Sequence, residues 1–277
     1  MSENKELIGQ KGAVKPDWLP HSWGQYFTNT SIFVNFRNIE HFKHYVSKVK
    51  QKDDKQCGVS YSTALDDLLR NKATISKDKY ELVKNTVRNN LLKRGLISET
   101  CYESYEYHHE GDIIDYSKLA EMDPNCCLVP SEKYINYFHE LFINISYPYY
   151  VDDSTVRDNM AKILATIECL EHERIYIKVS LVFFGSGSID TGGNFLSVMP
   201  LFHHKETKTI ELMSSILNER LLRKFYFAIM ETELGDKLSA SYGMAIKPSH
   251  CVDVWDVKEV DLVKDIYKKL NIEFKDE

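Results

Sequence analysis

The sequence has no apolar run approaching the roughly 20 residues that a membrane-spanning helix requires. Its first 18 residues, MSENKELIGQKGAVKPDW, lack the apolar core of a secretion signal. The six cysteines show no C-x-x-C spacing and are too few among 277 residues for a disulfide scaffold. These absences predict a cytoplasmic protein with reduced thiols and no membrane partner.

An excess of positive charge is also missing, since the formal net charge is -6. Such a chain has no general attraction for phosphate groups, so nucleic acid is the less favoured partner. The glycine-rich stretch GSGSIDTGGN at 185–194 matches neither G-x-x-x-x-G-K-[ST] nor G-x-G-x-x-G, and no lysine follows it. It is better interpreted as a surface loop at a strand end, where Ser186 and Ser188 could contact a partner.

Hydrophobic residues make up 43% of the chain and charged residues 27%, as in an ordinary globular protein. We expect three segments. Residues 1–20 are polar and predict a flexible arm, residues 21–130 predict an α-rich region packed on the core, and residues 131–277 predict an α/β core.

The clearest pattern begins near Leu141. The segment ELFINISY at 140–147 predicts a strand, residues 152–173 carry apolar side chains at helical spacing, and RIYIKVSLVFF at 174–184 alternates as a strand does. Strand, amphipathic helix and strand with short connections form a βαβ unit, which requires a parallel pair and a right-handed crossover. Further strands near 194–204 and 249–257 and helices near 209–234 and 258–271 complete an α/β sandwich.

Five segments together resemble an uncharacterised phage-borne family that is similar to von Willebrand A domains: SWGQYF at 22–27, GVSYSTALDDLLRN at 58–71, YEYHHEGDIIDYSKLAEMDPNCCL at 105–128, FINIS at 142–146 and LRKFYFAIMETE at 222–233. The resemblance implies a von Willebrand A-like, Rossmann-type sandwich with a mainly parallel sheet. It also implies a phage protein acting in the host cytoplasm. The family commonly has His-Pro before the late arginine, whereas this chain has Asn218-Glu219.

A metal-binding von Willebrand A domain has Asp-x-Ser-x-Ser after its first strand, because a hard cation prefers carboxylate and hydroxyl oxygens. This chain has Asn144-x-Ser146-x-Pro148 instead, and the nearby Asp152 and Asp153 are explained by capping of the next helix. We therefore predict no metal, no cofactor and no catalytic residue.

Four other pairs of side chains have simpler explanations than a metal site or catalysis. The pairs His108-His109, His203-His204 and Cys126-Cys127 would each offer a metal one ligand, because neighbouring strand residues point to opposite faces. Asp112 and Asp115 in GDIIDY fit a turn better than a catalytic carboxylate pair.

The leading hypothesis is a non-enzymatic phage protein that binds another protein, of host or phage origin, through loops of this scaffold. A host antiviral defence component is one such target, and an oligomer is also allowed. The predicted partner contacts are Asn144, Ser146, Tyr147, Tyr149, Asp152, Ser186 and Ser188.

Two alternatives remain open from the sequence. The first is a nucleic-acid-binding protein that uses Arg220, Arg223 and Lys224 beside the aromatic run 225–227, because basic and aromatic side chains together can stack on bases. The second is a divalent-metal-dependent enzyme built around Ser146 and Asp152.

Overall fold

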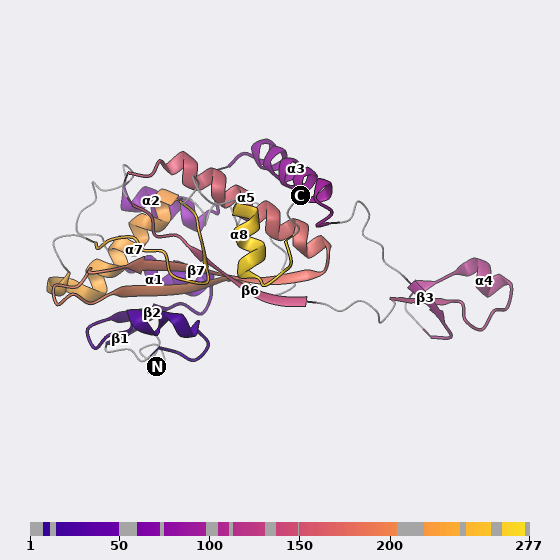
Figure 1. Cartoon of the computed structure of the whole chain (residues 1–277), viewed down its shortest axis with the longest axis horizontal. Helices are drawn as coiled ribbons and strands as arrows, with labels where there is room; N and C mark the ends of the chain where they lie inside the picture. The colour runs from indigo at the N-terminus through magenta and orange to yellow at the C-terminus, as the bar shows by residue number, and fades with distance from the viewer. Residues whose placement is uncertain are drawn as a thin grey trace.

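The computed structural model describes residues 8–11, 15–49, 60–72, 75–97, 105–110, 113–130, 137–148, 150–203, 219–238, 242–255 and 262–274. Its main element is a six-stranded sheet in the order β1-β2-β8-β7-β6-β9 (Figure 1). The strands are β1 (Ile8–Lys11), β2 (Ile32–Asn35), β8 (Phe195–Phe202), β7 (Ile175–Gly185), β6 (Tyr137–Asn144) and β9 (Cys251–Asp253). Three pairings are parallel, and β1·β2 and β7·β8 are antiparallel. The chain thus has the mixed α/β fold with a mainly parallel sheet that the sequence predicts.

The predicted βαβ unit is confirmed. Strand β6 pairs in parallel with β7 over eight register positions, from Tyr137 opposite Ile175 to Asn144 opposite Val182. Between them lies α5 (Asp153–His172), which begins where the Asp152 side chain accepts a hydrogen bond from the backbone N–H of Ser154. One stripe of α5 is buried on the sheet, because its apolar residues recur at helical spacing.

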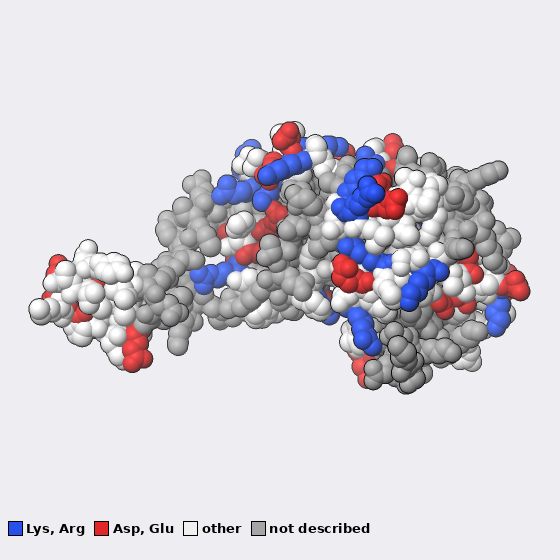
Figure 2. All heavy atoms as spheres, turned by 180° about the vertical axis from the view of Figure 1, so that it is seen from behind, with Lys and Arg blue, Asp and Glu red and all other residues white. Residues whose placement is uncertain are grey.

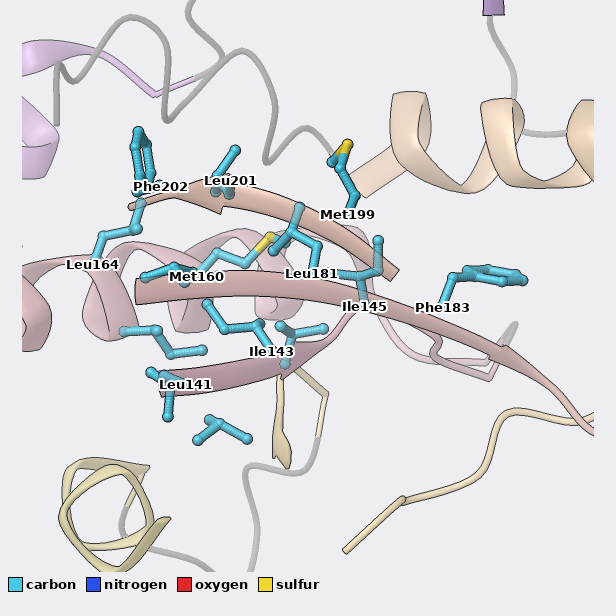
Figure 3. Packing of buried hydrophobic residues seen from close by; sticks show 14 of the residues in the cluster. Leu141, Ile143, Ile145, Met160, Leu164, Leu181, Phe183, Met199, Leu201 and Phe202 are labelled. Carbon is cyan, nitrogen blue, oxygen red and sulfur yellow. The ribbon is translucent and has the colours of Figure 1, made fainter. Parts of the chain in front are cut away.

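One face of the sheet carries the α-helices (Figure 1). They are α1 (Ile39–Val46), α2 (Tyr61–Leu69), α3 (Lys77–Lys93), α5, α7 (Glu219–Leu234) and α8 (Leu262–Lys269), and α7 continues into the short 3-10 helix η2 (Gly235–Lys237). Figure 3 shows Leu141 and Ile143 of β6 with Leu181 of β7 and Met160 and Leu164 of α5 in this core. Among the described residues, no helix is long and apolar enough to cross a membrane.

The opposite face of the sheet is covered by extended chain and the 3-10 helix η1 (His21–Tyr26). Trp23 of η1 is fully buried there, 5.1 Å from Phe142 and 6.4 Å from Phe184 between ring centroids. Its indole N–H donates to the carbonyl of Ser249 over 2.6 Å. Because strand side chains alternate between faces, Phe142 and Phe184 point to this cover while their neighbours point to the helices.

The N-terminal segments differ from the three predicted ones. A flexible arm is predicted for residues 1–20, but Ile8–Lys11 form β1 and Leu19 is buried under the sheet. The boundary predicted at residue 130 also separates strands that belong together, since β2 lies beside β8 in the same sheet. Pairing between distant segments satisfies the backbone hydrogen-bonding groups of these short strands, and local sequence patterns do not predict such pairing.

A second, three-stranded sheet is formed by residues 105–130, called the small module below. It contains β3 (Tyr105–His108), β4 (Ile113–Ile114), α4 (Tyr116–Ala120) and β5 (Cys127–Pro130), with strand order β3-β5-β4. Asp115 caps α4 by accepting from the N–H of Ser117 over 3.0 Å, as the turn interpretation of GDIIDY predicts. The small module projects away from the main sheet (Figure 1).

Replacing Trp23 by alanine should lower the free energy of unfolding by about 3–5 kcal/mol, because it leaves a cavity against Phe142 and Phe184. Urea titration followed by circular dichroism measures this loss. Trp18→Ala is the matched control and should cost less, since Trp18 is already 46% exposed. Equal losses for the two variants would contradict the role given to Trp23.

Candidate functional site

The candidate site lies at the carboxyl end of β6. The chain leaves this end through α5 to reach β7 on one side, while β9 pairs with β6 on the other side. In α/β sheets a ligand crevice forms where neighbouring connections diverge in this way. Asn144 ends β6, and Ser146 and Tyr147 follow it.

Asn144 holds this end of the sheet together. Its side chain is fully buried, and its amide nitrogen donates to the carbonyl of Ile246 over 2.8 Å and to Asp253 Oδ1 over 2.5 Å. Its Oδ1 accepts the backbone N–H of Ser146 over 3.1 Å. The amide is thus occupied within the fold, and the structure gives Asn144 a role inside the sheet in place of the predicted partner contact.

Ser146 joins β6 to β7. Its Oγ accepts the backbone N–H of Phe184 over 2.5 Å, and the residue is only 2% exposed. A hydroxyl has one proton to donate as well as lone pairs to accept with. Within the described residues no acceptor is found for the proton of Ser146, which leaves it available to a group bound beside it.

Beside Ser146 lies a cavity of about 310 Å³. It is lined by the end of β6 (Ile145, Ser146, Tyr147), the end of β7 (Phe183, Phe184), α7 (Arg223, Phe227) and the segment 242–245. That segment is held close to β7, because the backbones of Ser186 and Met244 exchange hydrogen bonds of 3.1 and 2.9 Å. Gly243 has φ of +85°, and a Cβ there would lie 2.6 Å from the carbonyl oxygen of Ser186.

Arg223 is the one charged side chain in this described lining. Its guanidinium carbon lies 5.0 Å from the ring centroid of Tyr147 and 5.3 Å from that of Phe227. No carboxylate of the described residues forms an ion pair with it. The cavity therefore combines an aromatic wall with a permanent positive charge.

Tyr147 and Tyr242 are neutral hydrogen-bonding members of the wall. The Tyr147 hydroxyl donates to Asp153 Oδ1 over 3.0 Å. Burial is the main cause that raises the pKa of Tyr147, and the negative charge of Asp153 raises it further. The Tyr242 hydroxyl donates to Glu231, and its ring stacks on that of Phe227 with centroids 3.9 Å apart. These contacts fix the rings before any ligand arrives.

The other predicted partner contacts have different fates. Asp152 caps α5 and is exposed, and Ser186 is tied to Met244. Ser188 is fully buried and donates to the carbonyl of Gly185 over 3.0 Å, so its hydroxyl is used within the loop. Tyr149 lies outside the described residues.

Several described residues of the nucleic-acid alternative lie in the core and not at the surface. Lys224 is fully buried, and the aromatic run 225–227 belongs to the core, where Tyr226 stacks on Phe183 at 4.6 Å. Arg223 faces the cavity, and the side chain of Arg220 lies outside the described residues. Bases could not stack on these buried rings, and a role of Arg220 and Arg223 in binding nucleic acid stays a prediction.

Among the described residues, no cluster of three or more His, Cys, Asp or Glu side chains is present that could hold a metal ion. His108 and His109 are exposed, Cys127 is buried, and His204 is outside the described residues. The carboxylate of Asp152 accepts the backbone N–H of Ser154 as the cap of α5. Nothing at Ser146 therefore assembles a ligand set from the described side chains.

Sequence reasoning missed Asp253 and the segment 242–245. Asp253 occupies the end of β9, where burial raises its pKa from 3.8 to about 6, and the hydrogen bond from Asn144 opposes that shift. The sequence signal that could have identified Asp253 was a carboxylate at the end of a short predicted strand. No local pattern could show that Gly243 would lie over β7.

The raised pKa of Asp253 predicts a pH dependence. A carboxyl that binds its proton more tightly in the folded chain favours folding in acid, so this stabilisation is complete below pH about 4 and is lost as pH rises through about 6. Asp253→Asn should therefore raise the free energy of unfolding at pH 8 by about 1–3 kcal/mol, with no gain at pH 4. Urea titrations at both pH values measure it. The exposed Asp236→Asn is the control, and an equal or pH-independent change in both variants would contradict the prediction.

Comparison with known proteins gives one match. No curated protein and no solved structure matches the chain. A family described as "Domain of unknown function (DUF7192)" matches residues 19–273, which include every strand of the main sheet except β1, the cavity and the small module. The chain therefore belongs to the DUF7192 family.

Proposed function

We propose that the protein is a non-enzymatic binding protein that holds a carboxylate of another protein in the cavity between β6, β7 and α7. The observation that carries this proposal is the position of Arg223, a charged side chain without a carboxylate partner among the described residues, in an aromatic-lined cavity. A carboxylate on an apolar or aromatic side chain, or at a chain end, has the complementary chemistry.

The size and place of the cavity support a binding role. Sites for small groups commonly have volumes of roughly 300–1,000 Å³ and occur where α/β sheet connections diverge. At about 310 Å³ the cavity suits a single side chain or a chain terminus better than a large cofactor. Its walls are set by backbone pairing at Met244 and by ring stacking at Tyr242, so little ordering is required on binding.

Arg223 and Ser146 supply the polar contacts. A guanidinium presents its N–H groups in a plane and binds a carboxylate through two parallel hydrogen bonds. Tyr147 and Phe227 support the guanidinium from their ring faces, which favours one orientation. The hydroxyl proton of Ser146 is a further donor at the same cavity.

The rim favours a protein partner over a free metabolite. Met244 lines the cavity and is 73% exposed. Large apolar side chains beside a buried charged anchor are typical of the centre of a protein interface. The partner would then insert its carboxylate and cover Met244.

We further propose a von Willebrand A-like scaffold. Its support is the order β8-β7-β6-β9, in which a βαβ unit is followed by an antiparallel strand and a later strand returns beside β6. The helices on a single face are a departure from a sandwich covered by helices on both sides. A phage source, and a host antiviral defence component as partner, are proposals that rest on the sequence resemblance.

The carboxylate site predicts a simple binding difference. Isothermal titration should detect N-acetylphenylalanine, which has a ring and a carboxylate, and should give much weaker binding for N-acetylphenylalaninamide, which lacks the charge. Arg223→Gln should weaken binding of the acid about tenfold or more, because a charge-assisted hydrogen-bonded pair is lost.

Arg94→Gln is the matched control, since the Arg94 guanidinium also lies over a ring, 5.3 Å from that of Phe274. It should leave binding unchanged. If the acid and the amide bind equally, or if both arginine variants lose the same affinity, the carboxylate site is disproved. Affinity purification from the natural host with wild-type and Arg223→Gln baits then identifies the partner as the protein that only the wild type retains.

A further inference from the structure

The small module exposes most of its apolar side chains. Among its described side chains only Cys127 is buried, at 9% exposure. Its exposed large apolar residues are Tyr107, Ile114, Tyr116, Leu119 and Met122. A unit of 26 residues is too small to bury such a set by itself, and exposed apolar clusters on a folded protein mark interaction surfaces.

Three of these residues lie along α4 and its end. Tyr116 and Leu119 are three positions apart and so share a face of the helix, and Met122 follows three positions later. Met122 is 90% exposed and has φ of +57°, a left-handed conformation that glycine would adopt at lower cost. Met122 thus exposes a long apolar side chain to solvent at a backbone conformation that favours glycine, which has no side chain.

The small module is also strongly acidic. It carries six carboxylates, Glu106, Glu110, Asp112, Asp115, Glu121 and Asp123, against the single lysine Lys118, which gives a net charge of -5 out of -6 for the whole chain. On the face drawn in Figure 2, the part of the module at the left shows acidic and uncharged atoms and no lysine or arginine.

The positive charge of Lys118 is already used within the small module. Its ammonium lies 3.4 Å from the ring centroid of Tyr107 and forms an ion pair of 3.4 Å with Asp123. Asp115 is likewise occupied, since it accepts from the Tyr107 hydroxyl over 2.9 Å and caps α4. Glu110 and Glu121 are exposed carboxylates left at the surface.

This charge decides between kinds of partner. Nucleic acid and an anionic membrane surface would be repelled by a net charge of -5, and so would the same module of a second copy. A basic protein segment is attracted instead. The apolar residues would supply affinity on contact, and the carboxylates would supply orientation and rate of association.

We propose that the small module is a docking surface for a basic segment of a partner protein. Apolar side chains of that segment pack on Tyr116, Leu119 and Met122, and its lysine or arginine side chains face Glu110 and Glu121. This site is separate from the cavity at Arg223 and has the opposite charge preference, so the two proposals stand independently.

The test is selection from a random peptide display library against the full chain. Peptides that carry lysine or arginine together with aliphatic or aromatic residues should be enriched. A purified selected peptide should bind about tenfold or more weakly to Leu119→Ser and to Met122→Ser, because each removes an apolar anchor. Its affinity should also fall as salt rises.

Leu69→Ser is the matched control, because Leu69 is 49% exposed and Leu119 is 48% exposed, and it should leave the affinity unchanged. Met122 is exposed enough that its replacement does not endanger folding, which circular dichroism verifies. Absence of any enriched basic peptide, or equal affinity of the selected peptide for Leu119→Ser and Leu69→Ser, would each overturn the docking surface. Acidic peptides that bind the wild type but not Arg223→Gln would instead report on the cavity.

Discussion

The amide of Asn144 is the interaction on which the end of the central sheet depends. It bonds to Asp253 at the end of β9, to the carbonyl of Ile246 and to the N–H of Ser146. An amide can do this because it has both donors and an acceptor, whereas a carboxylate in its place would face Asp253 as a second negative charge. The neutral residue that argues against a cation here is also the one that joins three segments of the chain.

The hydrogen bonds of Asn144 also determine how the cavity is arranged. Ser146 is fixed by the N–H of Phe184, and the segment beginning at Tyr242 is fixed by Met244 and by Asn144 through Ile246. Helix α7 brings Arg223 over the remaining side. Each wall comes from a different part of the sequence, so the binding chemistry proposed for the cavity depends on a tertiary arrangement that the hydrogen bonds of Asn144 maintain.

The βαβ unit could be predicted because its signals are local: alternation in β7, helical spacing in α5 and a capping aspartate between them. The stretch from Ile32 to Val46 folds as β2 followed by α1, and a four-residue strand is too short for its period to be distinguished from a helix in the sequence. Arg223 was singled out in the sequence as a residue that could contact nucleic-acid bases, whereas it lines the cavity. Helical spacing alone does not show which neighbours a basic side chain contacts. Asp253 was missed because nothing local distinguishes a buried carboxyl from a solvated one.

The sequence by itself determined the α/β class, the elements with strong periodicity and the chemical character of the small module, whose acidity and apolar residues are matters of composition. Only the tertiary structure decided that β2 pairs with β8, that Trp23 covers the second face and that Arg223 and Ser146 share one cavity. The physical reason is the range of the interactions. Periodicity and capping act over a few residues, whereas strand pairing and burial join segments whose separation along the chain leaves no pattern to read.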